Sequence, residues 1–200
     1  MITNIEEIQT AMLSKAKEVK NHLFKRDWLL TSPGCNKKRK SLLLETANAI
    51  PASYIKILEK YSLNGVIIDD FELSPYSFKD TDTVEGLLNA LSDPFFPKEF
   101  MERHHMYQVG SYDTDLLCVT SGTEQFTDGE VLFVEEGYDI YNPEDSQIHP
   151  IAKDFEQFLI ILGNFDQVRR SVNEGKQEFL ERLKQLEVDE RYHSVWLSLF

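Results

Sequence analysis

The chain has 200 residues, of which 42% are hydrophobic and 12% aromatic; this composition suits one domain with a packed core and excludes an intrinsically disordered chain. The formal net charge is −13, and a protein this acidic is repelled by nucleic acids and by anionic membrane surfaces, so neither is an expected partner. The charge is +5 over residues 1–40 and −18 over residues 41–200, which favours a basic partner for the body of the chain, although acidity also serves solubility alone.

The cysteines and the apolar runs indicate the cellular compartment in which the protein is expected. The two cysteines, Cys35 and Cys118, are far apart and form no metal-binding or redox motif, so we expect both to be free thiols. The N-terminus is polar and lacks the apolar segment of a signal peptide, and the run FLIILGNF is too short to cross a bilayer. We therefore expect a soluble protein of the reducing cytoplasm.

The first fifty residues predict helices. Apolar residues recur every three or four positions over residues 3–24, and Thr3 or Asn4 can serve as the N-cap. The basic run at residues 37–40 is either an anion-binding patch or the solvated start of a helix, and the second interpretation is the simpler one beside an acidic body. A short helix is expected over residues 41–49, where the following proline stops it.

The next segment mixes helix and extended chain. A proline opens a helix expected over residues 51–62, and Asn64-Gly65 supplies its end. The β-branched residues that follow predict a short strand at residues 66–69. A helix is expected over residues 83–91, and the two prolines and three phenylalanines of residues 93–100 indicate a loop.

Three runs of strand length come next, over residues 106–113, 115–121 and 129–136, and a fourth is expected at residues 138–142. Asp128-Gly129 is a hairpin-turn candidate. Short connections between consecutive strands predict antiparallel pairing.

The C-terminal quarter returns to helical spacing. One helix is expected over residues 149–172, with Pro150 in its first turn, and another over residues 176–187, before a final apolar segment. The predicted fold class is α+β: an antiparallel sheet of about four to six strands flanked by helices, with extra N-terminal and C-terminal helices.

No catalytic motif is visible. The sequence contains no HxxxH or HExxH pair, no GxSxG elbow and no glycine-rich phosphate loop. We therefore expect no catalytic residue, metal or cofactor. The remaining candidates are carboxylates: residues 69–145 hold nineteen Asp and Glu against three Lys and Arg. Carboxylates spread so widely along the chain favour an acidic binding face or a solvated surface. They are not the pattern of a catalytic acid–base pair.

Two sequence patterns together resemble the SUKH superfamily, which includes a fungal regulator of cell-wall synthesis. The first is Ile-Pro-x-x-Tyr followed by Asn-Gly and a strand, and the second is Gly-x-Val followed by an Ile-Ala-x-x-Phe-x-x-Phe-Leu helix. The matching residues lie within residues 50–162 and are Ile50, Pro51, Tyr54, Asn64, Gly65, Gly129, Val131, Ile151, Ala152, Phe155, Phe158 and Leu159.

The resemblance implies an α+β domain over residues 50–170, with a helical extension at residues 1–49 and another, packed on the same domain, at residues 171–200. Bacterial members are typically immunity proteins, not enzymes, which bind a cognate toxin, often a nuclease, and block it inside the cell that makes it. The expected partner is thus a basic protein toxin, and the protein itself is expected as a monomer or homodimer.

The sequence also suggests which residues bind that partner. Carboxylates and tyrosines are common in interfaces with basic proteins. We expect the binding surface to contain Asp69, Asp70, Glu72, Tyr112, Asp113, Asp115, Glu135, Glu136, Tyr138 and Asp139. Two alternatives stay open: a regulatory scaffold of the same fold with several partners, and an enzyme that uses a carboxylate pair with Mg²⁺.

Overall fold

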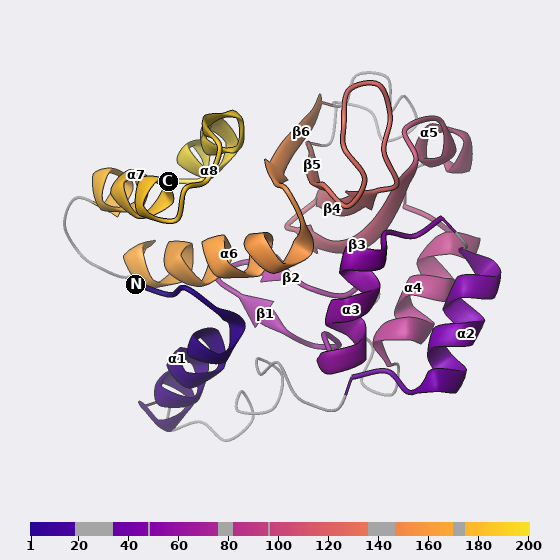
Figure 1. Ribbon diagram of the computed structural model, residues 1–200, viewed down its shortest axis with the longest axis horizontal. Coiled ribbons are helices and arrows are strands. Elements are labelled where there is room, and N and C mark those ends of the chain that lie inside the picture. Colours follow the sequence, from indigo (N-terminus) through magenta and orange to yellow (C-terminus); the bar gives the residue numbers. More distant parts are fainter. Residues whose placement is uncertain (19–33, 48, 76–81, 96, 136–146, 170–174) are drawn as a thin grey trace.

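The computed structural model describes residues 1–18, 34–47, 49–75, 82–95, 97–135, 147–169 and 175–200 (Figure 1). The helices are α1 (Ile5–Glu18), α2 (Lys37–Thr46), α3 (Ala52–Lys60), α4 (Thr83–Ser92), α5 (Lys98–Arg103), α6 (Phe155–Arg169), α7 (Gly175–Gln185), the short 3-10 helix η3 (Glu190–Tyr192) and α8 (His193–Ser198). The strands are β1 (Ile67–Ile68), β2 (Phe71–Glu72), β3 (Met106–Tyr112), β4 (Asp115–Thr120), β5 (Val131–Glu135) and β6 (Gln147–Ala152).

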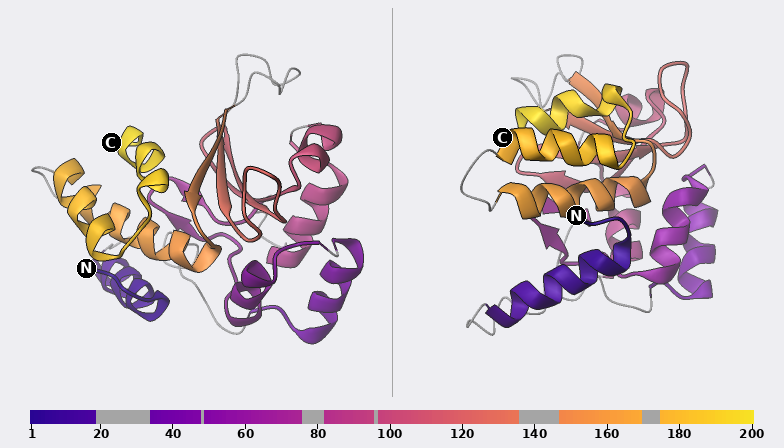
Figure 2. Two further views of the ribbon diagram at one scale, coloured as in Figure 1. Left: turned by 45° about the horizontal axis from the view of Figure 1, so that its top comes forward. Right: turned by 60° about the vertical axis from the view of Figure 1, so that its left-hand side comes forward.

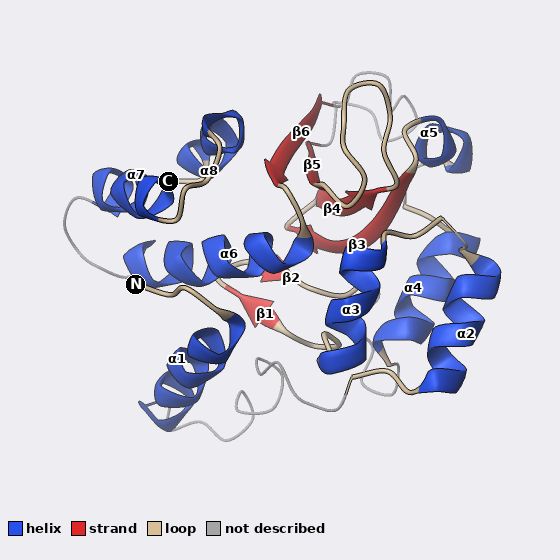
Figure 3. Ribbon diagram, viewed as in Figure 1, coloured by secondary structure: helices blue, strands red, loops and turns tan. Residues whose placement is uncertain are grey.

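The described strands form one six-stranded antiparallel sheet in which every strand pairs with its neighbours in the sequence. Two-residue turns explain the pairing of β1 with β2 and of β3 with β4. Strands β2 and β3 instead pair across residues 73–105, which contain α4 and α5. Helices lie on both sides of the sheet, with α6, α7 and α8 on one side and α4 and α5 on the other (Figures 2 and 3). The predicted α+β class is therefore confirmed.

The main core lies between one sheet face and α3, α6 and α8. Its largest members, fully buried, are Tyr54, Phe71, Phe133, Phe155, Phe158, Phe165, Phe179 and Trp196. Trp196 also donates a hydrogen bond from its indole Nε1 to the carbonyl of Ile151 at 2.9 Å. The C-terminal helix is thus fixed both by packing and by a directional contact with β6.

A smaller core covers the opposite sheet face. The strand residues Leu116, Cys118, Leu132 and Val134 face this side, whereas Leu117, Val119, Val131 and Phe133 face the main core. The sheet is therefore buried on both faces, which explains why β4 and β5 are continuous apolar runs instead of alternating ones. Helix α5 and the loop between β4 and β5 close the smaller core.

The N-terminal segment packs on the same core. Ile2, Ile5 and Ile8 are buried, and the buried Asn164 of α6 both accepts a hydrogen bond from the Ile2 N–H at 3.0 Å and donates one to the Ile2 carbonyl at 2.8 Å. As expected, the side chain of Asn4 caps α1, accepting from the Glu7 N–H at 3.0 Å. No helix among the described residues has both the length and the apolarity needed to cross a membrane.

Two predicted helix boundaries were wrong. Pro150 does not open a helix: it lies in β6, opposite Leu132, and α6 begins only at Phe155, where Asp154 accepts the Gln157 N–H at 2.8 Å. Proline is tolerated there because β6 is an edge strand. Asn64-Gly65 does not end α3, which stops at Lys60; Gly65, with a φ of 70°, instead forms the turn that leads into β1.

Two predicted loops also differed. Residues 98–103, expected within or beside a loop, form α5, which starts directly after Pro97. Asp128-Gly129 is not a two-residue hairpin connection but one turn within a longer loop between β4 and β5, closed by a hydrogen bond from the Glu130 N–H to the Thr127 carbonyl at 3.1 Å. The fourth strand expected at residues 138–142 lies outside the described residues.

Candidate functional site

Two tight turns place carboxylates at one end of the sheet. The β1–β2 turn consists of Asp69 and Asp70, because Ile68 pairs with Phe71. The β3–β4 turn likewise contains only Asp113 and Thr114. Asp69 and Asp113 have φ angles of 55° and 53°, a left-handed conformation that short polar side chains tolerate better than most. Aspartate at these two positions therefore has a structural reason besides any role in binding.

The strand register brings the two turns and the end of β5 together. Tyr112 pairs with both Phe71 and Asp115, and the pairing of Leu116 with Val134 places Asp115 beside Glu135. We call this the acidic end of the sheet: Asp69, Asp70, Glu72, Asp113, Asp115 and Glu135. It contains every predicted carboxylate that the structure describes. Glu136, Tyr138 and Asp139 lie outside the described residues.

A surface hollow of about 640 Å³ lies at this acidic end. It is lined by Ile67, Asp70, Glu72, Ser111, Tyr112 and Asp113. Four of the ten predicted binding residues thus share one concave surface. Ile67, which the sequence did not single out, is 36% exposed there and adds an apolar contact.

Arg169 is an arginine bonded to two carboxylates of this region. It ends α6, which runs back along the sheet and returns to the acidic end (Figure 1). Its Nη1 lies 2.6 Å from Asp69 Oδ2 and 3.6 Å from Asp70 Oδ2, and it donates to the Tyr112 hydroxyl at 3.4 Å. Sequence reasoning missed Arg169 because a hundred residues separate it from Asp69.

The ion pair between Asp69 and Arg169 acts on the pKa of each partner against the effect of burial. Burial raises the pKa of the Asp69 carboxyl above its ordinary value; Arg169 opposes this effect, and Asp70 and Asp166 add to it. Burial alone would lower the pKa of Arg169, but the Tyr112 hydroxyl and Asp69 raise it. At neutral pH both groups carry their charges, since the 2.6 Å contact is that of a charged hydrogen-bonded pair. Asp69 therefore already has an ion-pair partner within the fold.

The remaining predicted residues differ in how they are held. The Tyr112 ring packs on Phe71, with 4.6 Å between ring centroids, and is thereby fixed by the main core. Glu135 Oε1 lies 3.8 Å from His149 Nε2. Glu72 and Asp113 form no ion pair with any residue that the structure describes. Those two, with Asp70, are the carboxylates that the fold leaves most open to a partner.

The basic run at residues 37–40 starts α2, as the simpler interpretation predicted. Arg39 pairs with Asp82 at 2.9 Å and Lys40 with Glu59 at 2.5 Å. Half of the run is therefore neutralised within the chain. Among the residues that the structure describes, Lys37 and Lys38 are the members of this run that form no ion pair.

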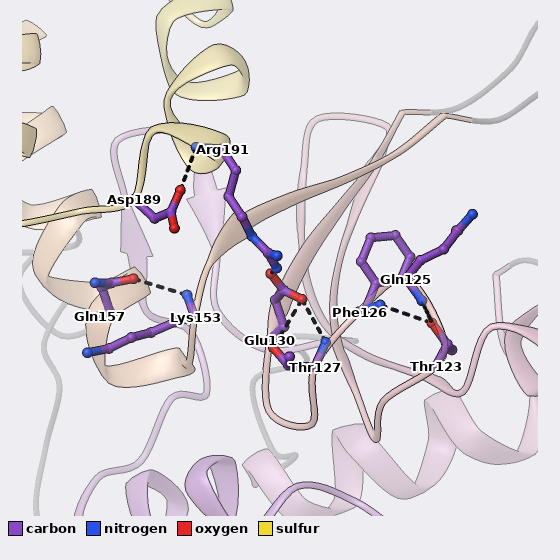
Figure 4. Close-up of polar contacts among 9 residues, drawn as sticks. All are labelled: Thr123, Gln125, Phe126, Thr127, Glu130, Lys153, Gln157, Asp189 and Arg191. Atoms are coloured by element: carbon purple, nitrogen blue, oxygen red, sulfur yellow. Dashed lines mark hydrogen bonds and ion pairs between the residues drawn. The ribbon is translucent and has the colours of Figure 1, made fainter.

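Two features escaped the sequence analysis. An apolar hollow of about 460 Å³ lies between α4, α5 and β3, because β2 pairs only with Ser111 and Tyr112 and leaves the rest of that β3 edge to α4. At the opposite end of β5 from the acidic end, the carboxylate of Glu130 is completely buried and pairs with Arg191 (Figure 4). A charged residue next to an apolar strand was the only sequence signal for this pair.

The acidic end presents exposed carboxylates, a fixed tyrosine and one apolar side chain. Such a surface can bind ammonium and guanidinium groups of a protein partner. Within the described residues, no three His, Cys, Asp or Glu side chains are placed so that they could hold a metal ion. Comparison with known proteins finds no family model, no curated protein and no solved structure that matches this chain.

Proposed function

We propose that this protein is a non-catalytic immunity protein that binds a basic protein toxin through the acidic end of its sheet and blocks the toxin's active site. The observation that carries the proposal is the shared hollow of Asp70, Glu72 and Asp113. Two of these three carboxylates have no internal ion pair among the described residues. The class of partner, a toxin, rests on the resemblance to the SUKH superfamily in sequence pattern.

Physical chemistry supports a basic partner for such a surface. Asp70 and Asp113 are exposed on two-residue turns, and half-buried Glu72 lies in β2. Carboxylates held in this way lose little conformational entropy on binding, and their long-range field speeds the encounter with a cationic surface. The net charge of −13 adds to that field. A nuclease toxin needs a basic cleft to hold nucleic acid, and an acidic sheet end can occupy the cleft by the same charge complementarity.

The test is binding to, and protection from, the product of the gene beside the one for this protein, expressed as a toxin. The triple variant Asp70→Asn, Glu72→Gln and Asp113→Asn removes three charges and keeps the shape of each side chain. We expect it to lower the affinity about 10- to 100-fold and to weaken the salt dependence of association. Co-expression with the triple variant should no longer protect cells fully.

A matched control carries the same change of charge elsewhere. Glu45, Glu99 and Glu124 are exposed and lie outside the acidic end, and their triple change to Gln should alter the affinity less than about threefold. Equal losses in both triples would mean that net charge, and not this surface, attracts the partner. Full protection by the Asp70, Glu72 and Asp113 triple would place the binding surface elsewhere, and a harmless neighbouring product would contradict the immunity function itself.

A further inference from the structure

The loop between β4 and β5, residues 121–130, covers the smaller core. Its Phe126 is 9% exposed and packs in the cluster that contains Met106, Cys118 and Leu132. The loop is internally ordered: Thr123 Oγ1 accepts from the N–H groups of Gln125 and Phe126, both at 3.1 Å (Figure 4). The loop therefore behaves as one preformed piece, which we call the flap.

The flap is held at its end by a buried charge. The side chain of Glu130 is 0% exposed. Its Oε2 accepts from the backbone N–H of Thr127 at 2.9 Å and from the Thr127 hydroxyl at 3.3 Å, and its Oε1 forms an ion pair with Arg191 (Figure 4). A carboxylate taken fully out of water is very unfavourable unless a cation and hydrogen-bond donors compensate it.

The compensating cation comes from a separate element. Arg191 belongs to η3 in the C-terminal segment, its side chain is 41% exposed, and its guanidinium lies 4.9 Å from the centre of the Tyr192 ring. It can therefore move into solvent without crossing packed protein. Trp196, five residues later, stays anchored in the main core, so release of Arg191 does not require the segment to unfold.

The flap also has hinges. Gly122 and Gly129, near its two ends, both have a φ of 89°, a conformation that glycine adopts without strain. Two backbone hydrogen bonds join the ends, from Thr120 N to the Glu130 carbonyl at 3.1 Å and from Gly129 N to the Thr120 carbonyl at 2.9 Å. The first flap residues also contact His105: the Ser121 N–H donates to the His105 carbonyl at 3.0 Å, and His105 Nδ1 lies 2.8 Å from the Gly122 carbonyl oxygen. The ladder between β4 and β5 does not include the flap.

We propose that residues 121–130 are a flap that closes the smaller core, and that the Arg191–Glu130 ion pair is the latch that keeps it shut. When Arg191 leaves, Glu130 must turn toward water, Thr127 loses its acceptor and the adjacent Phe126 lifts from the apolar face around Cys118. Ser121, the first flap residue, lines the apolar hollow beside α4 and α5, so opening also widens that hollow. This device is independent of the proposed toxin binding.

Cys118 is a built-in probe of the open state. It is 0% exposed, and burial raises the pKa of its thiol, so it is unreactive while the flap is shut. With Cys35→Ser as the background, Cys118 is the only thiol of the chain. Its rate of reaction with N-ethylmaleimide under native conditions then measures how often the flap opens, and hydrogen exchange of the α6 amides measures global unfolding.

The variants separate the latch from general stability. Arg191→Met keeps the aliphatic stem and removes the charge, and we expect Cys118 to react roughly 10- to 100-fold faster with no matching change in α6 exchange. Adding Glu130→Gln removes the buried charge that needed the cation, so the double variant should react within about threefold of the wild type. Arg182→Met is the control for a lost arginine outside the flap: it breaks a 2.6 Å pair with Glu178 and the bonds to Asn164 and Gln167 of α6, and it should leave Cys118 protected.

Several results would overturn the latch. They are an Arg191→Met variant whose Cys118 reacts at the wild-type rate, an equal acceleration of α6 exchange, a double variant as reactive as Arg191→Met, and an equal effect of Arg182→Met. If Arg191→Met does not fold, the double variant decides: a folded, protected double variant supports the latch, and a double variant that also fails to fold shows that Arg191 has only a structural role.

Discussion

Strand β5 has a glutamate at each end, and the fold gives the two opposite environments. Glu130, just before the strand, is 0% exposed and receives two hydrogen bonds and an arginine. Glu135, at its last position, has a side chain that is 44% exposed and, among the residues that the structure describes, lies 3.8 Å from His149 Nε2. A glutamate therefore forms buried contacts with Thr127 and Arg191 at the flap end of the sheet, whereas a glutamate at the acidic end is partly exposed to water.

The difference comes from the connections at the two ends. A ten-residue loop and η3 at the flap end supply enough N–H, hydroxyl and guanidinium groups to compensate a buried carboxylate. The two turns that the structure describes at the acidic end contain two residues each, and the arginine that the described residues place there is Arg169, beside Asp69. The number of carboxylates in the sequence does not distinguish Glu130 from Glu135. They differ in whether the carboxylate has partners within the protein that compensate its burial.

The largest effect is expected at the flap end. Gly129 and Gly122 share a φ of 89°, but a Cβ on Gly129 would lie 2.6 Å from Ser53 Oγ, whereas the nearest atom to a Cβ on Gly122 is 3.3 Å away. Gly129→Ala should therefore lower the free energy of unfolding by about 2 to 3 kcal/mol and Gly122→Ala by about 1 kcal/mol. Urea unfolding measures both.

Ser53→Ala provides the check on that cause. It removes the oxygen that the new methyl group would meet, so Gly129→Ala in this background should cost no more than Gly122→Ala does. If Gly129→Ala lowers the free energy of unfolding by the same amount with Ser53→Ala as without it, the contact with Ser53 is not the cause. The φ angle of Gly129 would then account for the whole loss of stability.

A smaller effect is expected at the acidic end, in the β3–β4 turn. Asp113 has a φ of 53° and is exposed, so only its backbone conformation opposes substitution. Asp113→Ala should lower the free energy of unfolding by about 1 kcal/mol, while Asp113→Gly and Asp113→Asn should change it by less than about 0.5 kcal/mol. Equal losses in all three would instead assign the aspartate charge a stabilising role in the fold.

The smallest effect concerns Asp69 and pH. Because its pKa is raised above the ordinary 3.8, the folded protein binds this proton more tightly than the unfolded chain does. The stabilisation linked to that proton is fully present below pH 3.8 and is lost as pH rises through the folded-state pKa. The stability of the wild type relative to Asp69→Asn should thus fall, by less than about 1 kcal/mol, as pH rises from 3.8 upward.

Urea unfolding of both proteins across this pH range measures the difference. A wild type that instead gains stability relative to Asp69→Asn with rising pH would show that the pair with Arg169 outweighs the cost of burying the carboxylate. The acidic end would then be internally compensated at Asp69 in the way that the flap end is at Glu130, and the contrast between the two ends would narrow.

Local patterns predicted most elements because their causes are local. Helical spacing, the Asn4 cap and the apolar runs of β3, β4 and β5 depend on neighbours in the sequence. The prediction failed at Pro150, because a helix start and an edge strand accept proline equally well, and only the pairing with Leu132 distinguishes them. It failed at residues 98–103 because α5 is stabilised mainly by packing Phe100 and Met101 into the smaller core.

The candidate site divides in the same way. The sequence predicted the aspartates as one acidic group from their charge and turn positions. Strand register brings them to the same end of the sheet. The ion pair of Asp69 depends on Arg169, one hundred residues away. The sequence by itself determined the α+β class, the acidic surface and the positions of the main strands, because these follow from composition and from short-range periodicity. Only the tertiary structure decided which carboxylates are buried, paired or open, because desolvation and ion pairing depend on groups that folding brings together from distant parts of the chain.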